Sequence, residues 1–145
     1  MKSRSDSAVE LMIAGGNCAQ AVLCAFLEGH GLEKRTAMKL ASGFGAGMGR
    51  NQEVCGAVTG AVMVIGMKHG QERPEDKEAK EKAYALTREL MERFRSEFGS
   101  CLCRDLLRVD LLTEEGQRKY KEDGLAEKVC RPCVRSAVRL LEEIL

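Results

Sequence analysis

The sequence has little of what nucleic-acid-binding proteins usually require. It contains no tryptophan, two tyrosines and four phenylalanines among 145 residues. It therefore lacks the aromatic platforms on which single-stranded nucleic acids stack. The 23 Lys and Arg residues nearly cancel the 22 Asp and Glu residues, and the positive charges form no basic stripe along the chain. These absences argue against a nucleic-acid partner.

No segment is long and apolar enough to suggest membrane insertion. The longest apolar run, residues 54–67, is interrupted by three glycines and a threonine, so it suits a buried helix better than a membrane span. The first residues, MKSRSDSAVELM, lack the apolar core of a secretory signal. We therefore expect a cytoplasmic protein whose thiols are mostly reduced.

The apolar pattern is helical. Apolar residues recur at helical spacing through most of the chain, and no alternating strand pattern is present. A chain of this length can bury a core without disulfide staples. The sequence therefore predicts an all-α fold, a compact single-domain bundle of about six to seven helices over residues 1–145.

Glycine, proline and capping residues mark the expected helix boundaries. Gly15 and Gly16 end a first helix that begins near Asp6, and Asn17 caps the second, where Gln20 completes a capping-box pattern. The region around residues 116–124 is expected to be a polar connection. The other expected helices are one with Ala37, Leu40, Ala41 and Phe44 on one face, an apolar helix from about Asn51, a long amphipathic helix from Pro74 to Gly99 with Ala79, Ala83, Leu86, Leu90 and Phe94 buried, a short helix capped by Ser100 that contains Cys101 and Cys103, and a last helix from Pro132.

Two glycines of the apolar helix share one face. Gly56 and Gly60 are four residues apart, and small residues at this spacing allow a second backbone to approach closely. We favour packing within the chain. A homodimer built on this face is the alternative.

Cysteine is the unusual residue of this sequence. There are seven, an odd number, so at least one thiol stays unpaired in the monomer. All but Cys24 lie near a predicted helix N-terminus, where unsatisfied amides favour thiolate over thiol. Cys18, directly after the Asn17 cap, is therefore predicted to be reactive. The alternative is that the thiols are buried structural residues. The six cysteines near helix starts are Cys18, Cys55, Cys101, Cys103, Cys130 and Cys133.

Three short motifs suggest other chemistry. CRPC at residues 130–133 resembles the thioredoxin motif but lacks the βαβ context of that fold. Together with CLC at residues 101–103 it offers four thiolates for zinc, although the spacing is not a familiar zinc pattern. GFGAGMG is not a dinucleotide-binding motif, but a glycine nest before a helix can bind a cofactor, cluster or anion. Its candidate residues, with the glycine that follows Cys55, are Gly43, Gly45, Gly47, Gly49 and Gly56.

Four segments together resemble the C-GCAxxG-C-C family of redox-active proteins. They are NCAQAV, ASGFGAGMGRNQEVCGAVTG, FGSCLCRDLL and VCRPCV, which span nearly the whole chain. The resemblance implies redox chemistry, and a similar cysteine region in split-Soret cytochromes is associated with an iron–sulfur cluster. It also implies that the family's four cysteines are Cys18, Cys55, Cys103 and Cys130, whereas Cys24, Cys101 and Cys133 are additional.

Three functions stay open at this point. In the first, Cys18 and Cys55 alternate between dithiol and disulfide, Cys103 and Cys130 form a second pair, and the protein exchanges electrons with a redox partner protein, either as a thiol oxidoreductase or as an electron carrier. In the second, the same four thiolates hold an iron–sulfur cluster or another metal. In the third, the protein is a structural or interaction protein with buried thiols. No residue pattern names a substrate.

Overall fold

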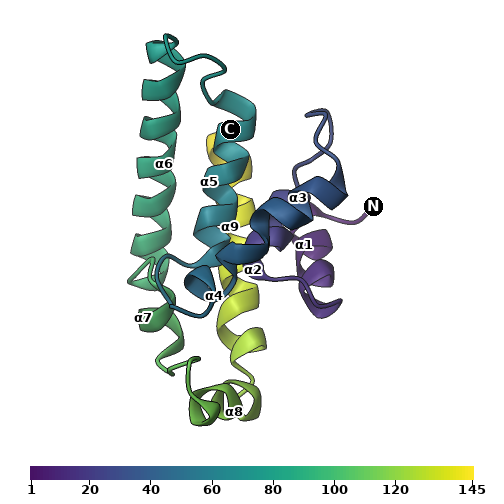
Figure 1. Ribbon diagram of the computed structural model, residues 1–145, viewed down its shortest axis with the longest axis vertical. Coiled ribbons are helices and arrows are strands. Elements are labelled where there is room, and N and C mark those ends of the chain that lie inside the picture. Colours follow the sequence, from purple (N-terminus) through teal and green to yellow (C-terminus); the bar gives the residue numbers. More distant parts are fainter.

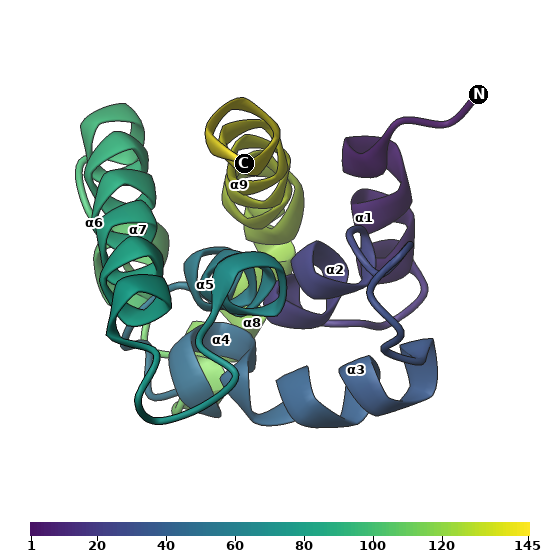
Figure 2. The same ribbon diagram turned by 90° about the horizontal axis from the view of Figure 1, so that it is seen from above.

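Helix α5 (Gly56–His69) lies at the centre of the fold. The computed structural model, which describes residues 1–145, packs this helix against α2 (Cys18–Cys24), α6 (Lys77–Phe98) and α9 (Arg131–Ile144). Figures 1 and 2 show α6 on one side of α5 and α2 on the other, with α9 behind. A helix that is apolar all round must be covered on several sides. The composition of α5 therefore accounts for its central position.

The remaining elements surround this centre. Helix α1 (Arg4–Ile13) packs on α9, and α3 (Lys34–Ala41) packs on α2. An isolated antiparallel bridge between Val54 and Leu102 is the only strand-like pairing, so the predicted all-α fold is confirmed. The shorter elements are a 3-10 turn (Ser42–Phe44), α4 (Gly45–Met48), α7 (Cys103–Leu107), α8 (Glu114–Glu122) and a π-helical turn (Ala126–Cys130) that leads into α9.

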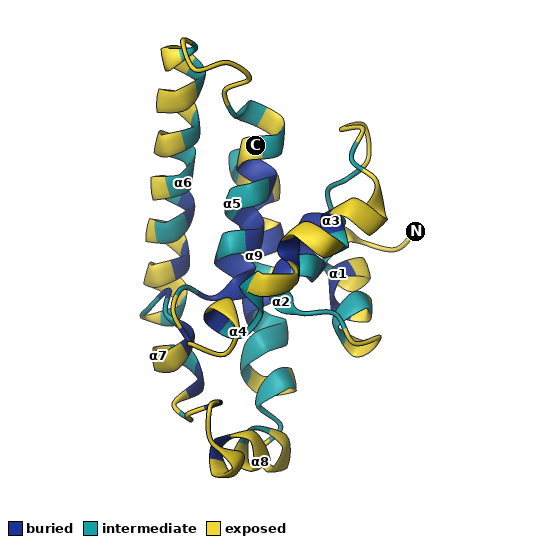
Figure 3. Cartoon of the chain, viewed as in Figure 1, coloured by how far each residue is buried: buried dark blue, intermediate teal, exposed yellow.

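Burial follows the apolar stripes of the helices, and Figure 3 shows the buried residues along the inner faces of α5, α6 and α9. On α6, Leu90 and Phe94 are fully buried as predicted, and the rest of the predicted stripe is half-buried. Leu40 contradicts its predicted place on a buried face, because 60% of it is exposed. Only Ala37 and Ala41 of α3 are buried, since this short helix packs chiefly on α2 and leaves its outer side to solvent.

The second helix begins as the sequence predicts. The Asn17 side chain accepts a hydrogen bond from the Gln20 amide at 2.9 Å, and the Gln20 side chain accepts one from the Asn17 amide at 2.8 Å. This capping box satisfies two amides that the helix itself leaves free. Gly99, with φ of 87°, ends α6 in the left-handed conformation that glycine favours.

Two predicted helix starts are wrong by several residues. Helix α5 begins at Gly56 instead of Asn51, because residues 53–55 are extended and pair with the chain before α7: the Cys55 amide donates to the Cys101 carbonyl at 2.8 Å. Helix α6 begins at Lys77 instead of Pro74. Asp76 caps it by accepting the Ala79 amide at 3.1 Å.

Two further expectations about the C-terminal half are wrong. Cys101 lies outside α7, which begins at Cys103, because the Ser100 hydroxyl accepts from the Leu102 amide and donates to the Asp105 side chain within a tight turn before the helix. The region expected to be a polar connection contains α8. Thr113 caps it through the Gly116 amide at 2.9 Å, and Thr-Glu-Glu is a helix-start signal that the sequence contained.

The glycine face of α5 packs within the chain. A β-carbon at Gly60 would lie 2.8 Å from the Ala19 carbonyl oxygen, and one at Gly56 would lie 3.0 Å from the β-carbon of Cys18. Both glycines therefore let α2 approach α5 closely, as favoured from the sequence. A homodimer stays a prediction. None of the helices combines the length and the apolar composition needed to cross a bilayer.

Candidate functional site

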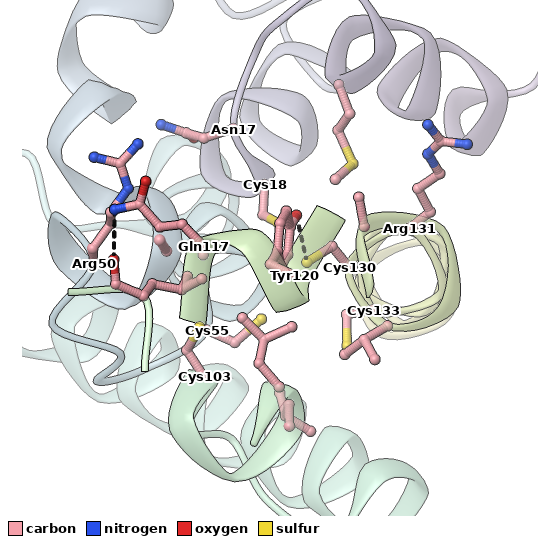
Figure 4. Close-up of a pocket in the computed structure, with 18 of the residues that line it drawn as sticks. Asn17, Cys18, Arg50, Cys55, Cys103, Gln117, Tyr120, Cys130, Arg131 and Cys133 are labelled. Atoms are coloured by element: carbon pink, nitrogen blue, oxygen red, sulfur yellow. Dashed lines mark hydrogen bonds between the residues drawn. The ribbon is translucent and has the colours of Figure 1, made fainter. Parts of the chain in front are cut away.

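Five of the seven cysteines line one cavity of about 330 Å³ (Figure 4). They come from the starts of four helices that are far apart in the sequence. The first residues of α2 and α7 and the residues immediately before α5 and α9 supply four of them, and α9 supplies the fifth. The structure thus brings together the four cysteines that the resemblance named, and it adds Cys133. The five are Cys18, Cys55, Cys103, Cys130 and Cys133.

The other two cysteines lie elsewhere. Cys24 is the half-buried last residue of α2 and lines a separate surface depression near the N-terminus. Cys101 is buried, and its thiol donates a hydrogen bond to the Met91 carbonyl of α6 at 3.4 Å. The sequence placed both outside the family motif, and the structure places both outside the cavity.

Cys130 is an acidified thiol of the site. A hydrogen bond from Cys18 lowers the pKa of Cys130 to about 7, burial opposes this effect, and a hydrogen bond with Tyr120 supports it. The Tyr120 hydroxyl lies 3.5 Å from the Cys130 sulfur (dashed in Figure 4). Burial is the main cause that raises the pKa of Tyr120, and the neighbouring Cys130 raises it further. Tyrosine therefore stays protonated and donates to the thiolate.

Cys18 is not the activated thiol that its position after the Asn17 cap predicted. Its hydrogen bond with Cys130, together with burial, raises the pKa of Cys18 well above the usual range. These effects outweigh the position of Cys18 at the start of α2. Proximity to a helix start alone therefore does not identify the reactive cysteine.

Cys55 is a second acidified thiol. A hydrogen bond from Cys133 lowers the pKa of Cys55 against the effect of burial, and the amides of Ala57 and Val58 in the first turn of α5 act in the same direction. The same hydrogen bond, with burial, raises the pKa of Cys133. Here the helix-start argument holds, because the amides of the first turn stabilise the thiolate.

Cys103 stays protonated. Burial raises the pKa of Cys103 to about 12, and the nearby Cys55 and Cys130 add to this effect. The strongest effects between thiols on their pKa values are therefore those between Cys18 and Cys130 and between Cys55 and Cys133. The pairs expected from the sequence were Cys18 with Cys55 and Cys103 with Cys130. All seven thiols are free in this structure.

The glycine-rich loop is mainly a packing feature. A β-carbon at Gly45 would lie 2.6 Å from the Asn17 side chain, and one at Gly47 would lie 2.6 Å from the backbone of Gln52. Gly43 and Gly49 face open space. Of the five glycines considered for cofactor binding, only Gly56 lines the cavity. A cofactor-binding role for this loop stays a prediction.

The cysteines do not fit a single metal ion in this arrangement. Thiolates suit zinc, iron and iron–sulfur clusters, but no group of three or more Cys, His, Asp or Glu residues is placed to hold a metal. Instead, the thiols affect one another's pKa values mainly in two pairs. We therefore derive no chemical step through a metal, and the iron–sulfur alternative stays a prediction.

Sequence reasoning missed two residues of this site and gave too little weight to a third. Tyr120 lies on α8, where a connection was expected, and the buried Gln52 lies near enough to Cys103 to act against the rise in its pKa. Gln52 donates to the Val109 carbonyl at 2.7 Å and accepts from the Leu111 amide at 2.8 Å, which fixes the chain that leads to α8. The sequence could have placed Cys133 at this site, because residues three apart in a helix, such as Cys130 and Cys133, lie on the same side.

The fold and the site define a small all-helical protein whose cysteines converge from several helix ends on one cavity. A sequence model of the C_GCAxxG_C_C family, described as "putative redox-active protein", matches residues 16–144. The chain belongs to this family, and the resemblance drawn from its four cysteine motifs is confirmed. Comparison with curated proteins and with solved structures gives no match.

The interaction between Tyr120 and Cys130 leads to a prediction about pH. In the reduced protein, alkylation of Cys130 by iodoacetamide should rise with pH to a midpoint near 7, where the thiolate forms. Tyr120→Phe removes a donor that stabilises this thiolate, so the midpoint should move upward by about one pH unit. Mass spectrometry with peptide fragmentation, which resolves Cys130 from Cys133, measures the rate. Tyr84→Phe, at an exposed tyrosine of α6, is the control. An unchanged midpoint in Tyr120→Phe would contradict the assignment.

Proposed function

We propose that this protein is a thiol redox protein that cycles Cys18 and Cys130 between dithiol and disulfide. The observation that carries this proposal is the pairing of two unlike thiols in one cavity. Cys130, with a pKa of about 7, is half-ionised at neutral pH, while Cys18 beside it is protonated. A nucleophilic thiolate next to a second thiol is the arrangement that thiol–disulfide exchange requires.

The exchange proceeds in two steps. The Cys130 thiolate attacks one sulfur of a substrate disulfide, the substrate S–S bond breaks, and one substrate thiolate leaves as a mixed disulfide forms. Cys18 then loses its proton and attacks the Cys130 sulfur, which releases the second substrate thiolate and closes the Cys18–Cys130 bond. The two protein thiols lose two electrons and two protons, and the substrate disulfide gains them as two thiols. A dithiol of a redox partner protein reduces the protein again by the reverse sequence and becomes a disulfide itself.

The environment of Cys18 suits the second step. The negative charge of Cys130 is among the causes that raise the pKa of Cys18. In the mixed disulfide, Cys130 carries no charge, so this repulsion and the hydrogen bond to the thiolate are lost. Cys18 then ionises more easily. The first attack therefore prepares the thiol that performs the second.

Cys55 and Cys133 form a second pair of the same kind. Cys55 is acidified and Cys133 is protonated, and both line the same cavity. We assign them a relay role, in which they exchange with the first pair. Electrons would then pass from one pair to the other without a large movement of the helices. Exchange with a redox partner protein in the cytoplasm remains part of this proposal.

A stepwise oxidation tests the proposal. The fully reduced protein is titrated anaerobically with 2-hydroxyethyl disulfide at pH 7, remaining thiols are alkylated, and the disulfides are mapped by mass spectrometry. We expect the first two thiols to disappear together and to be recovered as a Cys18–Cys130 disulfide. Oxidation that starts at Cys24 or Cys101, or no loss of thiols, would overturn the proposal.

Metal analysis of the same preparation separates this proposal from the alternative. If the anaerobically purified protein contains stoichiometric iron, with visible absorption bands that Cys18→Ser removes, a cluster replaces the dithiol cycle. A protein without iron whose thiols oxidise in pairs supports thiol exchange.

A further inference from the structure

A left-handed backbone turn lies beside the thiols. Five consecutive residues have positive φ, from 53° at Ala46 to 71° at Arg50, and three of them are not glycine. L-amino acids disfavour this conformation, which collects at functional sites. The amides of Gln52 and Glu53 donate to the Ala46 and Gly47 carbonyls at 3.1 and 2.9 Å and close the turn. The residues at the two ends of this turn, Ala46 and Arg50, line the thiol cavity.

Two more cations line the same cavity. Lys121 comes from α8, and Arg131 is the first residue of α9. Figure 4 shows Arg50 and Arg131 on opposite sides of the sulfurs. We call Arg50, Lys121 and Arg131 the cation collar.

The collar has no partner within the protein. None of its three residues forms an ion pair, and no Asp or Glu lines the cavity. Of the neighbouring carboxylates, Glu53 pairs with Arg104 at 2.7 Å and Glu122 with Arg118 at 3.9 Å. The formal net charge of the protein is only +1. The positive potential at the cavity is therefore local, and it favours an anionic ligand.

The walls and the size of the cavity further restrict the class of ligand that can bind. Apart from the thiols and the collar, the walls are mostly apolar, with Met12, Leu106 and Leu111 among them. A volume of about 330 Å³ is at the lower end of the range of small-molecule sites. The cavity suits a compact molecule with an apolar centre and charged ends better than a folded protein partner.

We propose that the substrate of this site is a small disulfide that carries carboxylate groups. This inference rests on the proposed thiol exchange. The collar binds the carboxylates and presents the disulfide sulfurs to Cys130, which attacks one of them while the other leaves as a carboxylate-bearing thiolate. The specificity is electrostatic, because a neutral or cationic disulfide of the same size gains nothing from the collar.

Three disulfides of similar size and different charge provide the probes. They are 3,3′-dithiodipropionate (dianion), 2-hydroxyethyl disulfide (neutral) and cystamine (dication). The initial rate of oxidation of the reduced protein is measured with each at pH 7 and low salt. Each rate is divided by the rate of the same disulfide with 2-mercaptoethanol, which removes differences in intrinsic reactivity. We expect the normalised rate to be about tenfold higher for the dianion than for the dication, and the difference should shrink in 1 M salt, where the screening length is about 3 Å.

Charge variants identify the collar as the cause. Arg50→Gln, Lys121→Gln and Arg131→Gln should each lower the ratio of dianion to neutral rate by about threefold. Arg50→Lys retains the charge and should retain most of the ratio. Lys119→Gln is the matched control, because Lys119 is an exposed lysine of α8 that does not line the cavity. It should leave the ratio unchanged.

The outcomes distinguish this inference from the proposed function. Equal normalised rates for all three disulfides, with no effect of the three collar variants, would overturn the substrate class while thiol exchange stands. A normalised rate that is higher with cystamine than with 3,3′-dithiodipropionate would also overturn the substrate class. No oxidation of the protein by any of the three would overturn the proposed exchange and, with it, this inference.

Discussion

Cys130→Ser should lower the rate at which the reduced protein reacts with 2-hydroxyethyl disulfide at pH 7 by about threefold or more. Cys130, with a pKa of about 7, supplies much of the thiolate in the cavity at this pH. A serine hydroxyl is not ionised there and cannot replace it. Burial keeps Cys103 protonated, and the hydrogen bond with Cys55, together with burial, keeps Cys133 protonated. The residual rate should come from Cys55, whose pKa is lowered, and from Cys18, whose pKa falls when the Cys130 thiolate is absent.

Cys18→Ser should give a different defect in the same assay. The first attack by Cys130 remains, but the thiol that performs the second step is lost and only the slower exchange with Cys55 and Cys133 is left, so a mixed disulfide should build up that intact-mass spectrometry detects. Cys24→Ser, outside the cavity, is the matched control and should behave like the unsubstituted protein. A Cys130→Ser protein that reacts at the full rate would assign the attack to another thiol.

Gly60→Ala and Gly66→Ala should change stability in opposite directions, although both lie in α5. A β-carbon at position 60 would lie 2.8 Å from the Ala19 carbonyl oxygen and 3.0 Å from its α-carbon, and backbone atoms cannot rotate away. Helix α2 must therefore move, which should cost about 2 kcal/mol of unfolding free energy. A β-carbon at position 66 meets nothing within 4 Å. There, alanine should stabilise the protein by roughly 0.5–1 kcal/mol through its helix propensity.

Urea unfolding followed by circular dichroism under reducing conditions measures both effects. The gain from helix propensity is common to the two substitutions, so their difference isolates the close contact between α2 and α5. Equal stabilisation by both would mean that the two helices do not approach at Gly60. The shift of α2 should also disturb Cys18, because this cysteine is the first residue of that helix, so Gly60→Ala should react more slowly with disulfides as well.

The sequence predicted helix boundaries correctly where residues close together in the chain determine them. The Asn17 and Gln20 capping box and the glycine at the end of α6 depend on atoms within one turn of the chain. It was wrong at the start of α5, where pairing with the distant Cys101 segment holds residues 53–55 extended. It was also wrong about Leu40, because the side on which α3 packs depends on the position of α2.

The sequence motifs predicted four cysteines of the site, the structure places all four on one cavity, and the family match supports the redox class. Their individual roles could not be named, because a thiol pKa depends on the groups that reach the sulfur through space. Cys18 and Cys130 are separated by most of the chain, and the tyrosine that acidifies Cys130 lies on a helix that the sequence pattern did not predict.

By itself, the sequence determined an all-helical chain with a central apolar helix and cysteines gathered near helix starts, because these properties follow from composition, periodicity and capping. Only the tertiary structure decided that five of those cysteines share one cavity, that Cys18 acidifies Cys130 and Cys133 acidifies Cys55, and that three cations without an ion pair line the same cavity. The reason is physical. Periodicity and capping act between residues a few positions apart, whereas acidity, pairing and the charge of a cavity depend on distances that arise when remote segments pack together.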